Sequence, residues 1–449
     1  MRRPVLRSLA GGAAGITSGV IAGVVLTAVS AAGPPALPNP PALIDAAHVP
    51  PLLRVPGEPV RLRYSIVCTP SDGGLPCDGS GTVFLRAGRV GSFRPFALQR
   101  GDESKDGRYY LDVPHDIAAS QDGFSYYAVL QDHATGASVS VPSGGADAPQ
   151  VSLPLHEPVA VSLGAHAFGA VREPDARAAE AAWGSGAGEV GLEVSPGLGY
   201  TGPSSFDVEP DGTVDLLDSV NERIVRSTHG RHEQVALGTG GTELADFAAE
   251  PNGTFDVLDM HDTLRRYRAD GTQEWAQKLA DRTWAKLDRG AAVLQQPSEQ
   301  WMPIAAGSAP LTRREQRRAA QAAKHLANGH GLLVDRVGDG ELRVAELRGD
   351  AQIRSWRITS ETPLGEVQLA ESHGNGIVVV TRVYTDGRDE FVVLVLGSRG
   401  LVQRFSVASG SWTETAPLAR FRFARGALYR LRTTESGASV DRFDLEVPQ

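Results

Sequence analysis

The sequence predicts an all-β protein in which an N-terminal β-sandwich is followed by a six-bladed β-propeller, with seven blades as the alternative. Three observations lead to this prediction. The 449 residues include 51 Gly and 29 Pro, a content typical of turn-rich chains. Short runs of alternating apolar and polar residues recur along the chain, as in half-buried strands. A repeat of about 41 residues in the second half matches the spacing of propeller blades.

Length and charge limit the kind of protein this is. A hydrophobic content of 41% is enough to bury cores, and at about 150 residues per domain the length allows two or three domains. The 44 basic and 53 acidic residues give a formal net charge of −9, which favours solubility. Nucleic-acid-binding proteins usually carry a basic surface, so we expect no nucleic-acid partner.

Residues 1–32 have the layout of a secretory signal peptide. Three arginines within the first seven residues precede an apolar run rich in Ala, Gly and Val, and small residues follow at 28–32. The alternative is an uncleaved anchor, because residues 11–32 are just long enough to cross a bilayer of about 30 Å. We expect a secreted or extracytoplasmic protein of bacterial composition, at the cell surface and in contact with a membrane only if this segment anchors it.

A Pro-rich stretch, residues 33–59, is predicted to be a stiff extended linker. The alternating runs that predict the sandwich follow at 60–157, where Gly, Asp and Pro separate short strand-like segments. Cys68 and Cys77 enclose a turn-forming segment within this region. In an oxidising compartment two cysteines so close together are expected to form a structural disulfide.

Residues 122–132 resemble the penultimate strand of immunoglobulin-like and fibronectin type III domains. The segment reads Asp-Gly-Phe-Ser-Tyr-Tyr-Ala-Val-Leu-Gln-Asp, with tyrosines at 126 and 127. The resemblance implies that a tyrosine hydroxyl closes a corner of the sandwich against nearby backbone. The alternative is a tyrosine exposed on an edge strand.

The repeat lies beyond an irregular segment, 158–188, which is expected to form a linker or a short helix. Phe-Asp-Val-Glu-Pro-Asp-Gly-Thr-Val-Asp-Leu-Leu-Asp at 206–218 is echoed by Phe-Ala-Ala-Glu-Pro-Asn-Gly-Thr-Phe-Asp-Val-Leu-Asp at 247–259. The Pro-Asp-Gly and Pro-Asn-Gly turns permit positive φ, and the alternating residues after them fit a blade strand. Residues 189–449 hold six periods of roughly 43 residues, which gives six blades. Strands from 156–186 would raise the number to seven.

This region resembles the NHL-type family of six-bladed β-propellers. The resemblance is carried by Trp183–Glu189 as a lead-in, Gly202-Pro203, Pro210-Asp211-Gly212 and Asp218–Val225. It implies that each such segment forms a β-hairpin, a loop and the next strand.

One segment, 312–327, departs from the β pattern and is predicted to be a helical insertion. Its composition favours helix, and Thr312 with Glu315 forms a capping box. Its alanines and Leu326 could dock on the propeller while its arginines and Lys324 face water. A basic helix could bind an acidic partner or lipid head groups, but we favour a solvated insertion.

Four acidic residues, Asp207, Glu209, Asp211 and Asp215, resemble the calcium loop of integrin-type propeller blades. Oxygen ligands at alternate positions with a glycine at the bend can converge on one Ca²⁺. However, Glu209 is long for its place, Pro210 stiffens the loop, and the second repeat lacks two of the ligands. We therefore favour an ordinary hairpin and expect no cofactor, and keep these four residues as the metal candidate.

Sequence motifs for nucleophilic or phosphate chemistry are missing, since there is no Gly-x-Ser-x-Gly, no His-Glu-x-x-His and no phosphate loop. Some six-bladed propellers are metal-dependent lyases or lactonases, and such an enzyme is the alternative function, with His229, His261, His330 and His373 available as ligands. We favour a binding or structural protein, and not an enzyme, that presents the propeller face to a protein or glycan ligand. The mouth of the propeller is the expected site.

Overall fold

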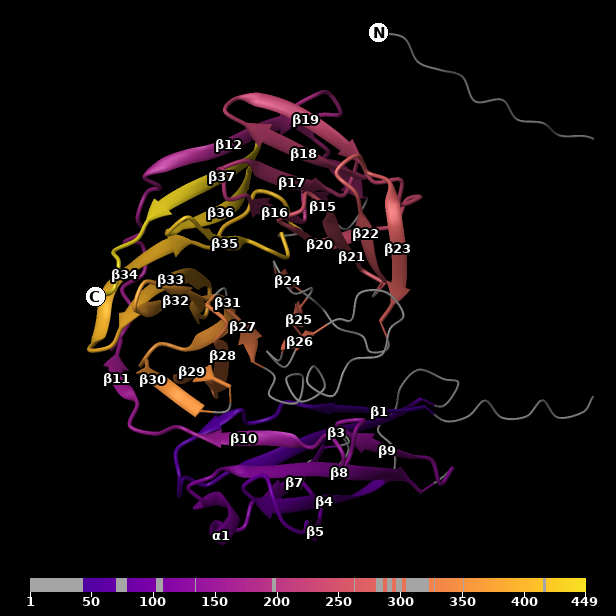
Figure 1. Cartoon of the computed structure of the whole chain (residues 1–449), viewed down its shortest axis with the longest axis vertical. Helices are drawn as coiled ribbons and strands as arrows, with labels where there is room; N and C mark the ends of the chain where they lie inside the picture. Colours follow the sequence, from indigo (N-terminus) through magenta and orange to yellow (C-terminus); the bar gives the residue numbers. More distant parts are fainter. Residues whose placement is uncertain are drawn as a thin grey trace, which may run out of the picture. The chain divides into compact units, whose positions relative to one another are not determined.

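The structure is a computed structural model, and the regular secondary structure of its described residues is almost entirely β-strand (Figure 1). The chain divides into two compact units, Met1–Pro41 and Ala42–Gln449, and all described residues belong to the second. Among them one helix is present, α1 (His115–Ala118), so the predicted all-β fold is confirmed. The described residues are 43–69, 79–101, 108–133, 135–195, 199–261, 263–279, 286–288, 293–295, 301–303, 323–326, 328–349, 351–414 and 417–449.

The first part of the described chain forms two sheets that enclose one core, a β-sandwich. One sheet has the strand order β1-β3-β7-β6 and the other the order β2-β10-β8-β4-β5, with β9 also paired to β8. Buried side chains from both sheets form one cluster around Tyr64, Val83 and Phe124. The strands are β1 (Leu43–His48), β2 (Leu53–Arg54), β3 (Arg61–Thr69), β4 (Gly79–Ala87), β5 (Arg94–Ala97), β6 (Gln99–Arg100), β7 (Arg108–Asp112), β8 (Phe124–Asp132), β9 (Ser138–Val141) and β10 (Gln150–Pro154).

The buried Tyr126 of β8 contacts a side chain where the sequence predicts a backbone corner. Its hydroxyl lies 2.7 Å from Nε2 of His48, whose Nδ1 lies 2.7 Å from the carbonyl oxygen of Arg63. Burial lowers the pKa of His48 to about 4, so the ring is neutral at pH 7. A neutral ring that donates from Nδ1 to the carbonyl accepts a hydrogen bond at Nε2 from the tyrosine hydroxyl. The expected corner is therefore replaced by a buried His–Tyr pair, and the likeness to immunoglobulin-like domains stays a prediction.

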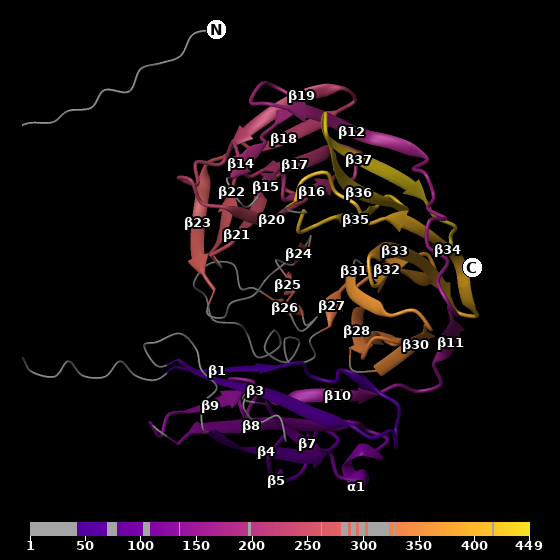
Figure 2. The same ribbon diagram turned by 180° about the vertical axis from the view of Figure 1, so that it is seen from behind.

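The remaining strands form the sheets of a β-propeller, arranged around a common centre in Figures 1 and 2. Three sheets, β16–β19, β20–β23 and β31–β34, are antiparallel with their strands in chain order. The strands are β11 (Val159–Ser162), β12 (Ala176–Trp183), β13 (Glu189–Val190), β14 (Glu193–Ser195), β15 (Gly199–Thr201), β16 (Ser205–Val208), β17 (Val214–Asp218), β18 (Arg223–Thr228), β19 (Arg231–Ala236), β20 (Leu244–Ala249), β21 (Phe255–Asp259), β22 (Thr263–Tyr267), β23 (Gln273–Lys278), β24 (Leu287–Asp288), β25 (Val293–Gln295), β26 (Trp301–Pro303), β27 (Lys324–His325), β28 (Gly331–Val337), β29 (Glu341–Arg348), β30 (Ala351–Thr359), β31 (Leu364–His373), β32 (Gly376–Thr385), β33 (Arg388–Gly397), β34 (Gly400–Ala408), β35 (Phe421–Ala424), β36 (Ala427–Thr434) and β37 (Gly437–Asp444).

The sequence repeat corresponds to equivalent hairpins of two neighbouring sheets. The turns before β17 and β21 place Gly212 at φ 98° and Gly253 at φ 80°, a region that glycine enters without a Cβ clash. Asp211 and Asn252 each accept the backbone N–H two residues ahead, at 2.8 and 3.0 Å. The turn chemistry read from the repeat thus produces the same local structure twice.

The segment 158–188 differs from the predicted linker or short helix, because it lies along the outer edges of three propeller sheets. β11 pairs in parallel with β30, Val171 forms a bridge to Ser406 of β34, and β12 pairs antiparallel with β37. β12 completes the sheet of β35–β37, so the beginning and the end of the propeller share one sheet. These strands extend existing sheets and form no separate sheet within the described residues, which is what seven blades would require.

The inner strands of successive sheets contact one another around a ring. β16 contacts both β35 and β20, β20 contacts β24, and β31 contacts both β28 and β35. An ion pair of 3.4 Å between Lys324 of β27 and Asp288 of β24 joins the remaining neighbours. Six sheets follow one another in this ring within the described residues. One of them, β24–β26, is described only as three short strands, so the number of six blades stays a prediction.

Two predicted segments differ where the structure describes them. Residues 43–48 and 53–54 belong to the predicted linker 33–59, but they form β1 and β2 of the sandwich. At the end of the predicted helix 312–327, Lys324–His325 form strand β27, and the Lys324 side chain is buried instead of facing water. Both segments gain backbone partners from a neighbouring strand, which local composition does not reveal.

Other predictions concern residues outside the described ranges. They are the signal peptide at 1–32, the linker up to residue 42, the part of the helical insertion at 312–322, and Cys77 with its predicted disulfide to Cys68. Among the residues that the structure describes, no helix is long and apolar enough to cross a membrane.

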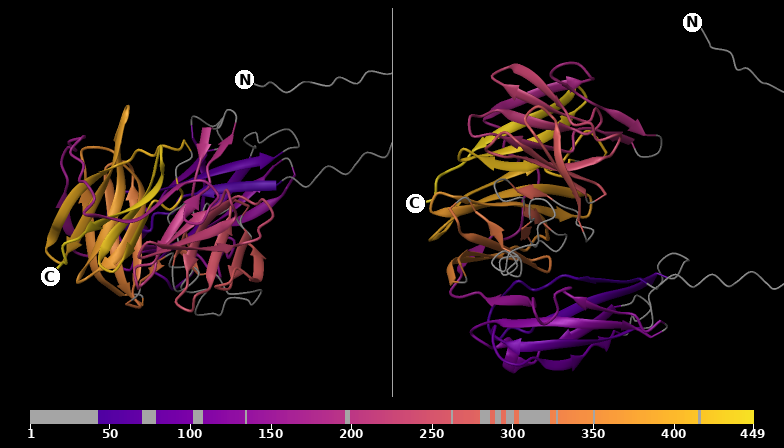
Figure 3. Two further views of the ribbon diagram at one scale, coloured as in Figure 1. Left: turned by 90° about the horizontal axis from the view of Figure 1, so that it is seen from above. Right: turned by 45° about the vertical axis from the view of Figure 1, so that its right-hand side comes forward.

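Figure 3 shows the strands of the sandwich and of the propeller from two further sides. Within the second unit, side chains of the two share an apolar cluster. It brings Leu53 and Leu153 of the sandwich against Leu333 and Leu347 of the propeller. The backbone N–H of Leu53 donates to Oδ2 of Asp335 at 2.8 Å. Burial raises the pKa of Asp335 to about 6, since the surrounding apolar side chains disfavour its charged form.

Candidate functional site

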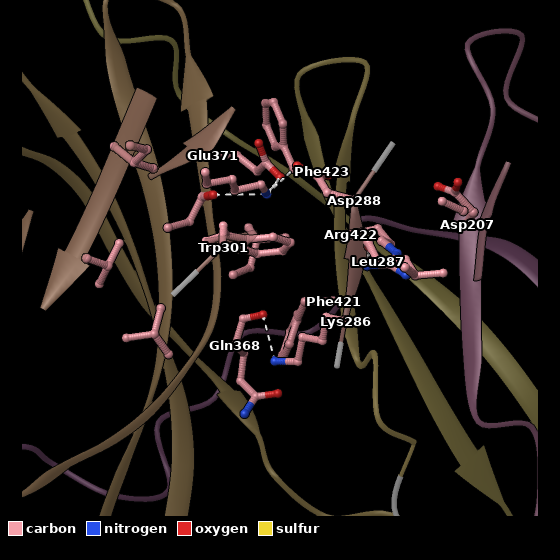
Figure 4. A pocket seen from close by; sticks show the side chains of 17 residues that line it. Asp207, Lys286, Leu287, Asp288, Trp301, Gln368, Glu371, Phe421, Arg422 and Phe423 are labelled. Carbon is pink, nitrogen blue, oxygen red and sulfur yellow. Dashed lines mark hydrogen bonds and ion pairs between the residues drawn. The ribbon is translucent and has the colours of Figure 1, made fainter. Parts of the chain in front are cut away.

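A cavity lies at the centre of the propeller, where the inner strands of its sheets meet (Figure 4). It holds about 830 Å³ of space, part of it open to solvent. The lining combines aromatic rings, aliphatic side chains and charged groups. The lining residues are Asp207, Ala248, Lys286, Leu287, Asp288, Trp301, Lys324, Leu332, Val334, Val367, Gln368, Leu369, Ala370, Glu371, Phe421, Arg422 and Phe423.

Lys324 is the centre of the first charged group in the cavity. Its Nζ donates to the carboxylate of Glu371. It also donates to the carbonyl oxygen of Ala370, at 3.3 Å, and lies 3.4 Å from Oδ2 of Asp288. The ammonium also lies 5.1 Å from the ring centroid of Trp301, within the range of a cation–π contact. Only 8% of the Lys324 side chain is exposed, so these contacts replace its hydration.

Two carboxylates, Glu371 and Asp288, share this one ammonium. Burial, together with the neighbouring Asp288 carboxylate, raises the pKa of Glu371 to about 7. Although burial opposes its charge, the attraction of Asp288 and Glu371 keeps the pKa of Lys324 above its usual value. Near neutral pH the cavity therefore contains a charged lysine and a carboxyl group that can gain or lose a proton.

Arg422 and Asp246 form the second charged group. Nη2 of Arg422 donates to Oδ1 of Asp246 at 2.6 Å, and Asp246 is fully buried. The same guanidinium donates from Nε to the carbonyl oxygen of Phe206, at 2.9 Å. Burial raises the pKa of Asp246, while the opposite charge of Arg422 lowers it. The pair connects β35 to β16 and β20 at the wall of the cavity.

Asp207 and Asp246 also tie each inner strand to the next. Oδ2 of Asp207 accepts the N–H of Ala249 at 3.0 Å, and Oδ2 of Asp246 accepts the N–H of Leu287 at 2.7 Å. Carboxylates that accept buried backbone N–H groups satisfy donors that a sheet edge would otherwise leave unpaired. These two aspartates thus position the strands that line the cavity.

Three polar groups of the lining have few or no contacts with the part of the protein that the structure describes. Among the described residues, no hydrogen bond reaches the carboxamide of Gln368 or the indole N–H of Trp301, and Figure 4 shows both side chains at the cavity. With the described residues, Nζ of Lys286 makes two contacts, each at the upper limit of hydrogen bonding: 3.3 Å to the carbonyl oxygen of Gln368 and 3.4 Å to Oε1 of Glu366. These groups are available to a ligand.

The four residues of the candidate calcium loop have separate contacts in the structure. Arg226 binds both Glu209, at 2.6 Å, and Asp215, at 3.0 Å. Asp211 accepts the N–H of Thr213 in the turn, and Asp207 lies on the inner strand described above. Burial raises the pKa of Asp215 to about 7 although Arg226 opposes that shift.

The next repeat shows the same use of carboxylates. Asp256 binds Arg266 through two contacts of 2.6 Å, in the place of Asp215 and Arg226. Among the described residues, no three His, Cys, Asp or Glu side chains are grouped so that they could hold a metal ion. The regular acidic positions of the repeat thus form ion pairs within each sheet.

The histidines considered for an enzyme lie elsewhere. None of His229, His261, His330 and His373 lines the cavity. Nδ1 of His330 lies 2.6 Å from Oε1 of Glu346, and Nε2 of His373 lies 3.0 Å from the carbonyl oxygen of Glu446.

Sequence reasoning does not single out the cavity residues, because they come from strands far apart in the chain. One signal was available in the composition. Lysine occurs at only four positions, 105, 278, 286 and 324, in a chain whose basic residues are otherwise arginine. Two of these four lysines line the cavity.

Comparisons with known proteins add little to this geometry. No protein-family model matches the chain, and no curated protein matches its sequence. Solved structures that match include virginiamycin B lyase from Staphylococcus aureus, at 9% identity over 57% of this chain and 88% of that chain, with a TM-score of 0.32. The WD40 repeats of RRP9 match at 9% identity over 57% of this chain and 97% of that chain, TM-score 0.32.

A Bacteroides fragilis protein proposed to be exported matches at 7% identity over 64% of this chain and 100% of that chain, TM-score 0.35. At such low TM-scores these likenesses carry no weight for the activity or the ligand of this chain. The chain is thus similar to β-propeller proteins, and its own ring of sheets, joined through β12 and β37, is the evidence for that fold.

Proposed function

We propose that this chain is an extracytoplasmic binding protein that takes a sugar unit of a glycan into the central cavity of its propeller. The observation that carries the proposal is the cavity, which combines aromatic rings with polar groups that lack partners among the described residues. Ligand sites are typically concave, with a few oriented polar groups among apolar walls.

The mixture of groups supports a sugar over other ligands. A sugar ring has an apolar C–H face that can pack on Trp301, since an aromatic face is slightly negative and the C–H groups are slightly positive. Its hydroxyls both donate and accept, and so match the carboxamide of Gln368, the indole N–H of Trp301 and the carboxyl of Glu371. A folded protein partner would contact the rim of the cavity and leave these interior groups unused.

The first test is a glycan array probed with the purified full chain, followed by calorimetry on the retained glycans. Trp301→Ala should weaken binding at least tenfold, because it removes the aromatic face. Trp275→Ala is the matched control, since Trp275 lies on the outer strand β23 and does not line the cavity. Binding of no glycan, or equal effects of the two variants, would contradict the proposal.

The alternative of a metal-dependent lyase or lactonase is tested with the same protein. Melting temperatures are measured with millimolar Ca²⁺ or Mg²⁺ and with a chelator. A rise of the melting temperature with a cation would support that alternative, and an unchanged value would count against it.

The expected location has its own measurement. Mass spectrometry of the mature N-terminus in the culture medium should find a start near Ala31, as predicted for a cleaved signal peptide. An intact N-terminus in the membrane fraction would indicate an anchored protein at the cell surface instead.

A further inference from the structure

The charged side chains of the cavity differ in how strongly they are paired with opposite charges in the described part of the chain. Lys324 is held by Glu371 and Asp288, and Arg422 is held by Asp246. Groups already paired inside the protein contribute little further attraction to a ligand charge, because their fields largely cancel. Of the other charged groups in the lining, Asp207 accepts the backbone N–H groups of Val208, at 2.7 Å, and Ala249, at 3.0 Å, so the charge preference depends on Lys286.

Among the described residues, Lys286 is the cavity cation with the weakest ion pair. Its contact with Glu366 is long, at 3.4 Å, and the Glu366 carboxylate is 61% exposed, so solvent screens that pair. The Lys286 side chain itself is only 15% exposed. An ammonium has three N–H donors, and in the described part of the chain they meet two weak acceptors. Lys286 can therefore form a stronger ion pair with an anion that enters the cavity.

The neighbours of Lys286 favour the same kind of ligand group. In Figure 4 Lys286 and Gln368 lie below Trp301, whereas Glu371 lies above it. The carboxamide N–H groups of Gln368 and the indole N–H of Trp301 are donors without partners in the described part of the chain. The side of the cavity around Lys286 thus presents donors, while the carboxylate of Glu371 lies on the other side of the tryptophan ring.

We propose that the ligand is a carboxylated sugar, whose carboxylate binds Lys286 and Gln368 while its ring packs on Trp301. The inference rests on the proposed function, since it names the class of sugar that the same cavity takes. A carboxylate accepts from both an ammonium and an amide, which uses the donors left unpaired on this side. The hydroxyls at the far end of the ring then face Glu371, which can donate or accept near neutral pH.

The experiment compares carboxylated glycans with their carboxyl-reduced forms. An array of uronic-acid oligosaccharides, the same oligosaccharides after reduction of each carboxylate to a primary alcohol, and unrelated neutral oligosaccharides is probed with the full chain. Retained glycans are titrated by calorimetry at low and high NaCl. We expect reduction of the carboxylate to weaken binding at least tenfold, and high salt to weaken only the carboxylated form.

Two variants assign the effect to Lys286. Lys286→Gln should weaken binding of the carboxylated glycan about tenfold and change binding of neutral glycans less than twofold. Lys278→Gln is the matched control, because Lys278 is exposed on β23 and lies outside the cavity. Melting curves of both variants show whether they fold.

Each outcome decides between the two proposals. Retained glycans that are neutral, or that bind equally after carboxyl reduction, would overturn the carboxylated-sugar inference and leave the proposed function intact. Equal losses in Lys286→Gln and Lys278→Gln would also overturn it. If no glycan of any class is retained, the proposed function itself fails.

Discussion

Removal of the buried Asp246 charge should destabilise the propeller strongly. In Asp246→Asn the amide cannot neutralise Arg422, whose guanidinium is only 16% exposed, and one amide N–H group must face a donor such as the N–H of Leu287. Asp246 now accepts from Arg422 at 2.6 Å, from Leu287 at 2.7 Å and from Phe247 at 2.9 Å. Breaking a buried ion pair on one side typically costs about 3–5 kcal/mol, and we expect a loss in this range.

The assay is urea denaturation at pH 7, with the free energy of unfolding compared between wild type and variant. Because the cost arises from an uncompensated charge, Arg422→Met combined with Asp246→Asn should be more stable than Asp246→Asn alone. The coupling energy of the double-mutant cycle should reach about 2 kcal/mol, as for residues in one buried network.

An exposed pair provides the control. Asp112 binds Arg61 at 2.6 Å, but 59% and 48% of these side chains are exposed. Asp112→Asn should therefore cost less than about 1 kcal/mol. If Asp246→Asn costs no more than Asp112→Asn, or if the effects of the two substitutions in the cycle simply add, the reasoning about the Arg422 charge is refuted.

Three further predictions concern pH and backbone conformation. The pKa of His48 is about 4 in the folded protein and about 6.5 in the unfolded chain. The free energy of unfolding of the wild type should therefore fall by up to about 3 kcal/mol as the pH drops from 6.5 to 4. Urea titrations of His48→Gln should show a weaker pH dependence, and an unchanged slope would contradict this. Folded Glu371 instead keeps its proton up to about pH 7, so its contribution to stability falls as the pH rises from about 4.5 to 7. The slope over that range should be lost in Glu371→Gln, and its persistence would assign the pH dependence to another group. Gly253→Ala should lower the free energy of unfolding by about 1–2 kcal/mol, because φ at this residue is 80°. Gly410→Ala, where nothing lies within 4 Å of the added Cβ, should lower it by less than about 0.5 kcal/mol. Equal melting temperatures for the two variants would contradict this reasoning.

Much of the fold is accessible from the sequence because its signals are local. The turns at Gly212 and Gly253, with a side-chain acceptor one residue before each glycine, are encoded within a few residues and repeat in the same form. The edge strand β12 is different. Its alanines and charged residues resemble a linker or a helix, and only its pairing with β37, more than 250 residues later in the chain, makes it a strand.

The candidate site was less accessible for the same reason. The acidic residues that attract attention in the repeat, such as Asp215, are bound by arginines on the neighbouring strand. Conversely, Lys324, Glu371 and Asp288 belong to three separate strands, and no spacing in the sequence relates them. A segment that resembles a helix also concealed Lys324, which the ring of sheets places in the cavity wall.

The sheet shared by β12 and β35–β37 has a consequence for the order of assembly. During synthesis β12 emerges early, but its partner β37 follows more than 250 residues later in the chain. Until then the ring stays open, and an unpaired edge at residues 176–183 can pair with another chain. The emergence of β37 allows the ring to close and covers the exposed edge of β12. A truncation that removes residues 437–449 keeps the sequence of every earlier strand. We nevertheless expect it to yield an open propeller that associates with other copies.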